Sequence, residues 1–127
     1  MSRRGDIERE IRHNCEKIDD YRNKISRLQE KARIIKDKER VIREEVYEPA
    51  RSSDMTYGTA FRGQLEQAAE EKQSEISYRT ASGLNETSEL LSDIQRIIDR
   101  IYELIEELEH RNSELEAELS SLIDDYY

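Results

Sequence analysis

Side chains suited to catalysis or metal binding are scarce in this sequence. There are two histidines, His13 and His110, and one cysteine, Cys15. Nucleophilic active sites and metal sites need several such groups at defined spacing, and neither a Ser/His/Asp set nor a Gly-rich phosphate loop occurs. A single cysteine excludes an internal disulfide, and we expect Cys15 to be a semi-buried residue beside a helical stripe. The sequence therefore predicts no catalytic residues, no cofactor, no metal site and no enzyme.

A run of glutamates near the C-terminus is the remaining candidate for acid–base or metal chemistry. Its members are Glu103, Glu106, Glu107, Glu109, Glu114, Glu116 and Glu118. They alternate with apolar residues at helical spacing, so we interpret them as the solvated face of a helix. Function must then be sought in the apolar face of that helix.

The apolar residues of the C-terminal half repeat every seven positions. One column is Leu84, Leu91, Ile98, Ile105, Asn112, Leu119 and Tyr126, and the other is Thr87, Ile94, Ile101, Leu108, Leu115 and Leu122. These are the a and d columns of a heptad repeat, which predicts a long amphipathic helix. A third row, Leu90, Ile97 and Leu104, widens the stripe and indicates more than one neighbouring helix. We predict a partner-binding stripe of Leu91, Ile94, Ile98, Ile101, Ile105, Leu108, Leu115, Leu119 and Leu122.

The N-terminal third repeats the same pattern. Its columns are Ile11, Ile18, Ile25, Ala32, Glu39 and Val46, and Ile7, Asn14, Tyr21, Leu28, Ile35 and Ile42. We expect a helix over about 6–47, with Asp6 as N-cap. Asn14 and Glu39 interrupt the seam. Polar residues at such positions commonly fix register or partner choice, but a location near a frayed or exposed helix end explains each of them equally well.

Residues 48–58 separate the two predicted helices. Pro49 disfavours a helical conformation for the residue before it and lacks an amide hydrogen, and a Ser/Asp/Thr-rich stretch with Gly58 follows. Thr56 or Thr59 could cap the second helix. That helix then carries a weaker stripe, whose residues are Phe61, Leu65, Ala68, Lys72, Ile76 and Thr80 or Gly83.

The expected fold class is all-α, a single domain over residues 1–127. The second helix spans about 59–125, and low helix propensity over 80–85 leaves two alternatives: a continuous helix in an elongated antiparallel hairpin or coiled coil, or a break near Gly83 that gives a three-helix bundle. If a straight second helix paired from the connection outward, residues from Arg100 onward would project past the first helix. Burial of that overhang would need self-association, a partner helix or a fold-back.

Charge is unevenly distributed along the chain. The net charge is -9, with 35% hydrophobic and 40% charged residues; residues 1–47 carry 14 Lys/Arg and 11 Asp/Glu, whereas the other 80 carry 7 and 19. The run Arg22–Arg43 is basic, as a nucleic-acid face would be, but the acidic second helix is the simpler destination for its charges. We therefore predict no nucleic-acid partner.

The N-terminus and the apolar runs bear on localisation. No apolar run approaches the roughly 20 residues of a membrane span, and the start Met-Ser-Arg-Arg-Gly-Asp lacks the apolar core of a signal peptide. We expect no membrane insertion and a cytoplasmic product, with export, if any, independent of a signal peptide.

Phe61-Arg62-Gly63, at the turn between the two predicted helices, could serve only as a plug for the end of the hairpin. It nevertheless resembles the Trp-x-Gly turn of WXG-type helical-hairpin proteins of the type VII (ESX) secretion system, with Phe in place of Trp. Those proteins also carry Tyr-x-x-x-Asp/Glu, and Tyr102 and Glu106 stand at that spacing on one helix face. The longer chain and acidic heptad tail look like small helical proteins associated with LXG toxins.

This resemblance implies a non-enzymatic helix-binding protein, a targeting factor or chaperone for a type VII-secreted LXG-type toxin. Its partners would be the helical LXG domain and the secretion machinery. The alternative is a self-assembling coiled-coil scaffold without an export role, in which the stripe forms a homo-oligomer.

Overall fold

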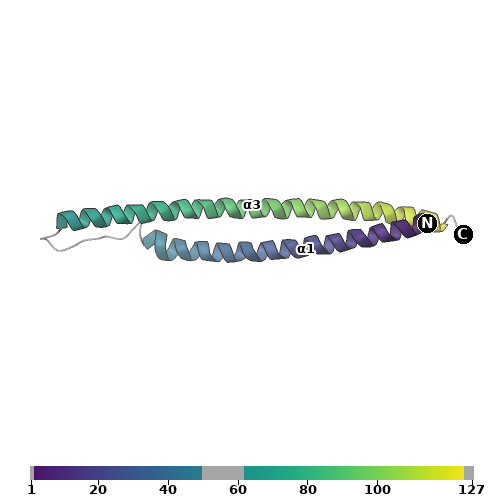
Figure 1. The fold of residues 1–127 in the computed structure, drawn as a ribbon, viewed down its shortest axis with the longest axis horizontal. Coiled ribbons are helices and arrows are strands. Elements are labelled where there is room, and N and C mark those ends of the chain that lie inside the picture. The colour runs from purple at the N-terminus through teal and green to yellow at the C-terminus, as the bar shows by residue number, and fades with distance from the viewer. Residues whose placement is uncertain (1, 50–61, 125–127) are drawn as a thin grey trace. The chain divides into compact units, whose positions relative to one another are not determined.

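A computed structural model describes residues 2–49 and 62–124, which form two long helices and no strand. Helix α1 spans Arg3–Ile42 and continues into η1, a turn of π-helix over Arg43–Tyr47; helix α3 spans Arg62–Asp124 (Figure 1). The all-α prediction is confirmed. The predicted connection falls mainly on residues 50–61, outside the described residues, as do Thr56 and Thr59.

Helix α1 begins earlier than its predicted cap. The Ser2 hydroxyl accepts a hydrogen bond from the Gly5 backbone amide at 3.1 Å, so Ser2 caps the helix. Asp6 lies in the first turn, where its carboxylate pairs with Arg9. The prediction of Asp6 as N-cap was wrong because a hydroxyl four residues earlier already satisfies a free amide of the first turn.

Helix α3 runs through Gly83 without a break. The Thr87 hydroxyl donates to the Gly83 carbonyl at 2.9 Å, a bond within the helix that does not interrupt it. The three-helix alternative required a break here, so the described residues form the two-helix alternative.

The chain divides into two compact units. The first unit contains Met1–Glu30 and Ile94–Tyr127, and the second contains Lys31–Asp93. In the first unit the two helix segments are antiparallel: Arg3 pairs with Glu118, Asn14 with Asn112, and Arg22 with Glu109. The first unit thus places α3 residues beyond Arg100 against the start of α1.

That pairing overturns the predicted overhang from Arg100 onward. The helices align where both heptads are rich in Ile and Leu and where their two asparagines meet, instead of pairing outward from the connection. In the second unit it is the start of α3 that extends past the end of α1 (Figure 1).

The second unit also corrects the weaker stripe. Ala68, Lys72 and Ile76 are exposed, with Ile76 at 47%. The half-buried row consists of Ala69, Gln73, Ser77 and Thr80, and the buried Leu84 follows it. Because α3 is continuous, the strong heptad that begins at Leu84 also determines which face of the preceding turns is buried. Phe61 and the side chain of Leu65 lie outside the described residues.

None of the described helices is long and apolar enough to cross a bilayer.

Candidate functional site

The predicted partner-binding stripe is largely occupied by the chain's own first helix. Five of its members are buried: Ile94, Ile98, Ile101, Ile105 and Leu115. Leu91, Leu108, Leu119 and Leu122 are half-buried. In the first unit the buried residues of α1 are Ile7, Asn14, Ile18 and Ile25, at the spacing of the facing seam. A partner can reach this stripe only by replacing α1 or by covering its outer edge.

The side chains of Ile97 and Leu104 mark that outer edge in the first unit. Ile97 is 50% exposed although its neighbour Ile98 is 3% exposed, and Leu104 lies one heptad after Ile97 and is half-buried. Ile97 therefore presents apolar surface without being part of the seam.

A buried polar layer interrupts the apolar seam of the first unit. Asn14 Nδ2 donates to Asn112 Oδ1 at 3.0 Å, and both residues are under 9% exposed. Asn112 Nδ2 in turn lies 3.6 Å from Cys15 Sγ. Cys15 is exposed, not semi-buried as predicted, and lies in a groove with Asp19, Arg22 and Glu116. The amide pair satisfies both side chains only when these two positions face each other.

Ion pairs on both sides of the seam agree with that alignment. Arg3 makes two hydrogen bonds to Glu118, of 2.8 and 3.0 Å, and Arg111 reaches Glu10 at 3.1 Å. The hydrogen bond from Arg3 lowers the pKa of the Glu118 carboxyl below its ordinary value, and the same bond raises the pKa of Arg3. All four side chains are substantially exposed, so these pairs guide alignment more than they stabilise the fold.

The predicted secretion motif is described only in part. Tyr102 is 47% exposed and Glu106 is exposed, four residues apart on α3. Arg62 and Gly63 form the first turn of α3, without described side chains, and Phe61 lies outside the described residues. Only Tyr102 and Glu106 of the motif can therefore be described with their side chains.

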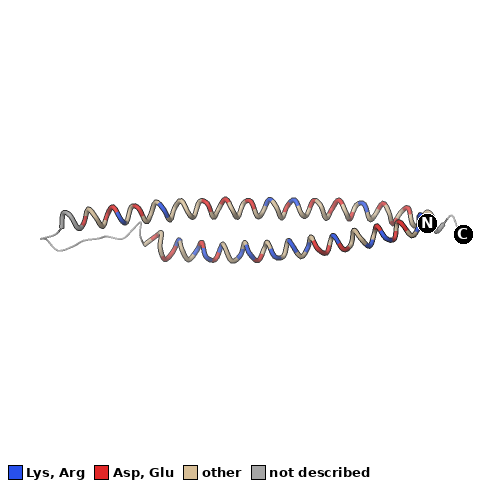
Figure 2. The backbone as a smooth tube through the Cα atoms, viewed as in Figure 1, with Lys and Arg blue, Asp and Glu red and all other residues tan. Residues whose placement is uncertain are grey.

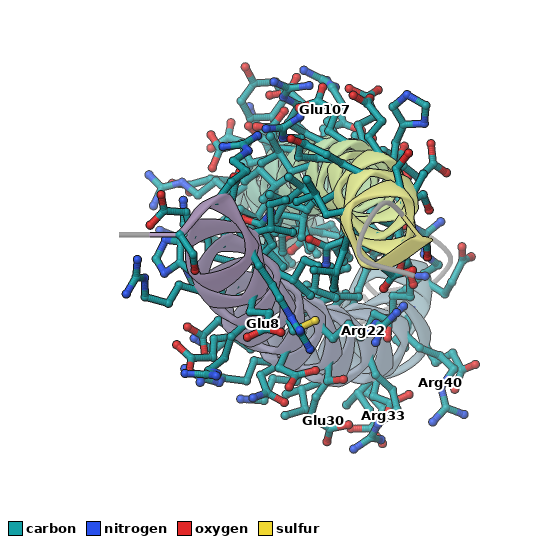
Figure 3. The ribbon with its side chains drawn as sticks, turned by 90° about the vertical axis from the view of Figure 1, so that its right-hand side faces the viewer. Glu8, Arg22, Glu30, Arg33, Arg40 and Glu107 are labelled. Carbon is teal, nitrogen blue, oxygen red and sulfur yellow. The ribbon has the colours of Figure 1, made fainter. Side chains whose placement is uncertain are left out.

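The basic run of α1 pairs with carboxylates of both helices. Arg22 reaches Glu109 of α3 at 2.9 Å, whereas Arg33 pairs with Asp37 and Arg43 with Glu39 within α1. Figure 2 shows the basic stretch of α1 and the predominantly acidic α3. The side chains of Arg33 and Arg40 project from the outer side of α1, and that of Glu107 from the outer side of α3 (Figure 3).

The second unit has a more polar seam than the first. Glu39 occupies a seam position, its side chain is only 18% exposed, and its buried Oε2 has no hydrogen-bond partner within the part of the chain that the structure describes. The heptad positions of α3 in this unit include Ser77, Thr80 and Thr87, all half-buried. This unit consequently buries less apolar surface per turn.

Apolar side chains lie instead on the outside of the second unit. Ile34 and Val41 of α1 are 39% and 43% exposed, and Ile76 and Leu90 of α3 are 47% and 49% exposed. The third row noted in the sequence included Leu90 but not Ile34 or Val41. Ile34 and Val41 are seven residues apart, and each lies one position before a predicted seam residue, Ile35 or Ile42. This spacing was the sequence signal that could have identified them as a second apolar row.

The few groups with potential for metal chemistry are dispersed. His110 Nε2 lies 3.0 Å from a Glu114 oxygen, and no group of three His, Cys, Asp or Glu side chains suited to a metal occurs over residues 2–49 and 62–124. A comparison of the chain with protein-family models, curated proteins and solved structures gives no match.

Proposed function

We propose that this chain is a non-enzymatic helix-binding protein that serves as a targeting factor or chaperone for a toxin with a helical LXG domain, exported by a type VII secretion system. The helical hairpin is the scaffold that such a role requires. The observation that carries the export role is the outward position of Tyr102 and Glu106 on a helix whose opposite face is packed.

Tyr102 and Glu106 are one turn apart, and neither belongs to the buried seam. Their neighbours Ile101 and Ile105 are 8% and 5% exposed and fix the helix against α1. A receptor can therefore read an aromatic ring and a carboxylate together on a rigid surface.

The toxin helix is proposed to contact the hairpin at the outer edge of the stripe, where Ile97 is half exposed. Substituting Ile101 would not test this contact, because a charge at a buried seam position destabilises the hairpin itself. Ile97→Asp introduces a charge at the edge and leaves Ile98 and Ile101 in place.

The binding test is co-expression of the full chain with the LXG domain of a toxin from the same genome, followed by affinity capture and light scattering. Wild type is expected to form a stable complex, which Ile97→Asp weakens by at least about tenfold, equivalent to about 1.4 kcal/mol. Ser92→Asp, an exposed position on α3, is the control and is expected to bind normally. Absence of any complex with wild type contradicts the toxin role.

The export test follows the tagged chain and toxin in the culture medium of cells with an active type VII system. Tyr102→Ala is expected to reduce export. Tyr78→Ala is the control and should leave export unchanged, because Tyr78 is 77% exposed but has no acidic residue four positions later. Equal export of both variants would show that the Tyr102/Glu106 pair is not a signal. The scaffold alternative predicts neither capture nor export.

A further inference from the structure

The second unit places polar side chains in its seam and apolar ones outside it. Glu39, Thr80 and Thr87 occupy seam positions, whereas Ile34, Val41, Ile76 and Leu90 are exposed by 39–49%. A two-helix unit gains most by the reverse distribution. This arrangement indicates that another helix surface covers the exposed residues.

Four exposed aliphatic residues, Ile34, Val41, Ile76 and Leu90, lie on one side of the unit, whereas Ile42 and Val46, which are 42% and 43% exposed, are seam positions. On α3, Ile76, Gly83 and Leu90 each precede a seam position by one residue. On α1, Lys31 and Lys38 likewise precede a seam residue by one position. Ile34 lies three residues after Lys31, and Val41 three residues after Lys38, so both lie on the same helix face as the lysines. In an antiparallel heptad pairing these positions of the two helices flank the seam on the same side. We name this surface, made of Ile34, Val41, Ile76, Gly83 and Leu90, the open flank.

Gly83 lies at the centre of the α3 side of the open flank. A Cβ added there would meet no atom within 4 Å. Glycine in a helix interior is less stable than alanine, so packing among the described residues gives no reason for it. A glycine between two exposed apolar residues does allow the backbone of a second helix to approach closely.

We infer that the open flank binds a second copy of this chain, with α1 of each protomer packed on α3 of the other about a two-fold axis. This dimer goes beyond the proposed function and does not depend on it. It brings Ile34 and Val41 of one protomer onto Gly83 and Leu90 of the other. The same surface is buried twice, as in any isologous contact.

Charge favours a second copy as the occupant. Residues 31–43 of α1 carry six Lys/Arg and two Asp/Glu, whereas residues 62–93 of α3 carry three and seven. Lys31 and Lys38 border Ile34 and Val41, and Glu86 and Asp93 border Leu90. Packing α1 on α3 of the other protomer therefore opposes unlike charges, whereas packing α1 on α1 opposes like charges.

The first test measures the mass of the purified full chain by light scattering over a concentration series. The chain has a mass of 15.1 kDa, and wild type is expected to approach twice that value. Leu90→Lys and Gly83→Leu should raise the dissociation constant at least about tenfold. Ser82→Leu, next to Gly83 but off the flank, should leave it unchanged, and circular dichroism checks that each variant stays helical.

Charge reversal provides the second test and identifies the occupant. Lys31→Glu with Lys38→Glu should prevent self-association, as should Glu86→Lys with Asp93→Lys, and a mixture of the two variants should restore dimers. A wild-type mass that stays at 15.1 kDa, or that exceeds two copies, overturns the inference. So does a mixture that remains monomeric, or a Ser82→Leu effect equal to that of Gly83→Leu.

Discussion

The amide pair of Asn14 and Asn112 offers the sharpest test of how the two helices recognise each other. The side chains are 6% and 8% exposed and share a 3.0 Å hydrogen bond. Asn14→Leu leaves the Asn112 amide buried with only a weak contact to Cys15 Sγ, and a buried unsatisfied amide costs about 1–3 kcal/mol. Burial of the new Leu side chain offsets part of this cost, so we expect the free energy of unfolding to fall by about 1 kcal/mol. Asn112→Leu should behave alike.

The double variant separates pairing from simple burial. With Leu at both positions no amide is left unpaired, and the apolar pair is expected to be at least as stable as wild type. The two single losses would then be strongly non-additive, with a coupling of about 2 kcal/mol, near the upper part of the range for residues in contact. Urea denaturation followed by circular dichroism measures all four proteins. Additive losses would refute the idea that the two amides act as a pair.

Three further predictions concern individual side chains. Ile98→Ala, at a position 3% exposed, should lower the free energy of unfolding by about 3 kcal/mol, while Ile97→Ala at 50% exposure should cost under about 1 kcal/mol; equal losses in urea titrations would contradict the seam assignment. Glu39→Leu loses the ion pair with Arg43 but removes a buried carboxylate oxygen, Oε2, that has no hydrogen-bond partner among the described residues, so it should raise stability by about 1 kcal/mol; a destabilised variant by the same assay would contradict this balance. The Arg3 hydrogen bond lowers the pKa of Glu118, so its contribution to stability is present above the unfolded pKa and is lost as the pH falls through the folded value; carboxyl NMR titration should show that pKa rising in Arg3→Gln, and an unchanged value would disprove the contact.

The sequence predicted the seam well because one strong signal determines it. The columns that contain Ile94, Ile98, Ile101 and Ile105 are the buried ones, and the polar interruption at Asn14 meets the Asn112 of the opposite column. Heptad spacing specifies which face of each helix is buried, and this holds whichever segment is opposite.

The pairing alignment could not be obtained from helix lengths. Pairing the two helices outward from their connection placed Arg100 beyond the end of the first helix. In the structure the Ile-rich layers and the asparagine pair set the alignment instead, and Glu109 meets Arg22 while Glu118 meets Arg3. Pairing Asn14 with Asn112 would have given this alignment from the sequence, since it is the solution in which each amide meets another amide. The weak stripe failed for a related reason: Ala68 and Ile76 were assigned a phase of their own, although a continuous helix imposes the phase of Leu84.

The candidate site was only partly accessible to sequence reasoning. The Tyr-x-x-x-Glu spacing placed Tyr102 and Glu106 on one helix face, and the structure leaves both exposed. The open flank was missed because Ile34 and Val41 belong to neither seam column. Burial within the chain, which a single sequence does not report, separates these outward residues from the half-buried Ile35, whereas Ile42 of the same predicted seam column is itself 42% exposed.

The antiparallel pairing of α1 and α3 within one chain is the central structural claim, and the native Cys15 allows it to be measured directly. Cys15 and Glu116 line the same groove, so in Glu116→Cys a short bismaleimide should link the two thiols within one polypeptide. Gln95→Cys places the second thiol about 30 Å further along α3, at roughly 1.5 Å per residue, and should not be linked. Intramolecular cross-linking of the Glu116→Cys variant alone is the expected result. Cross-linking of both variants, or links only between chains, would contradict the pairing of Asn14 with Asn112 within one chain.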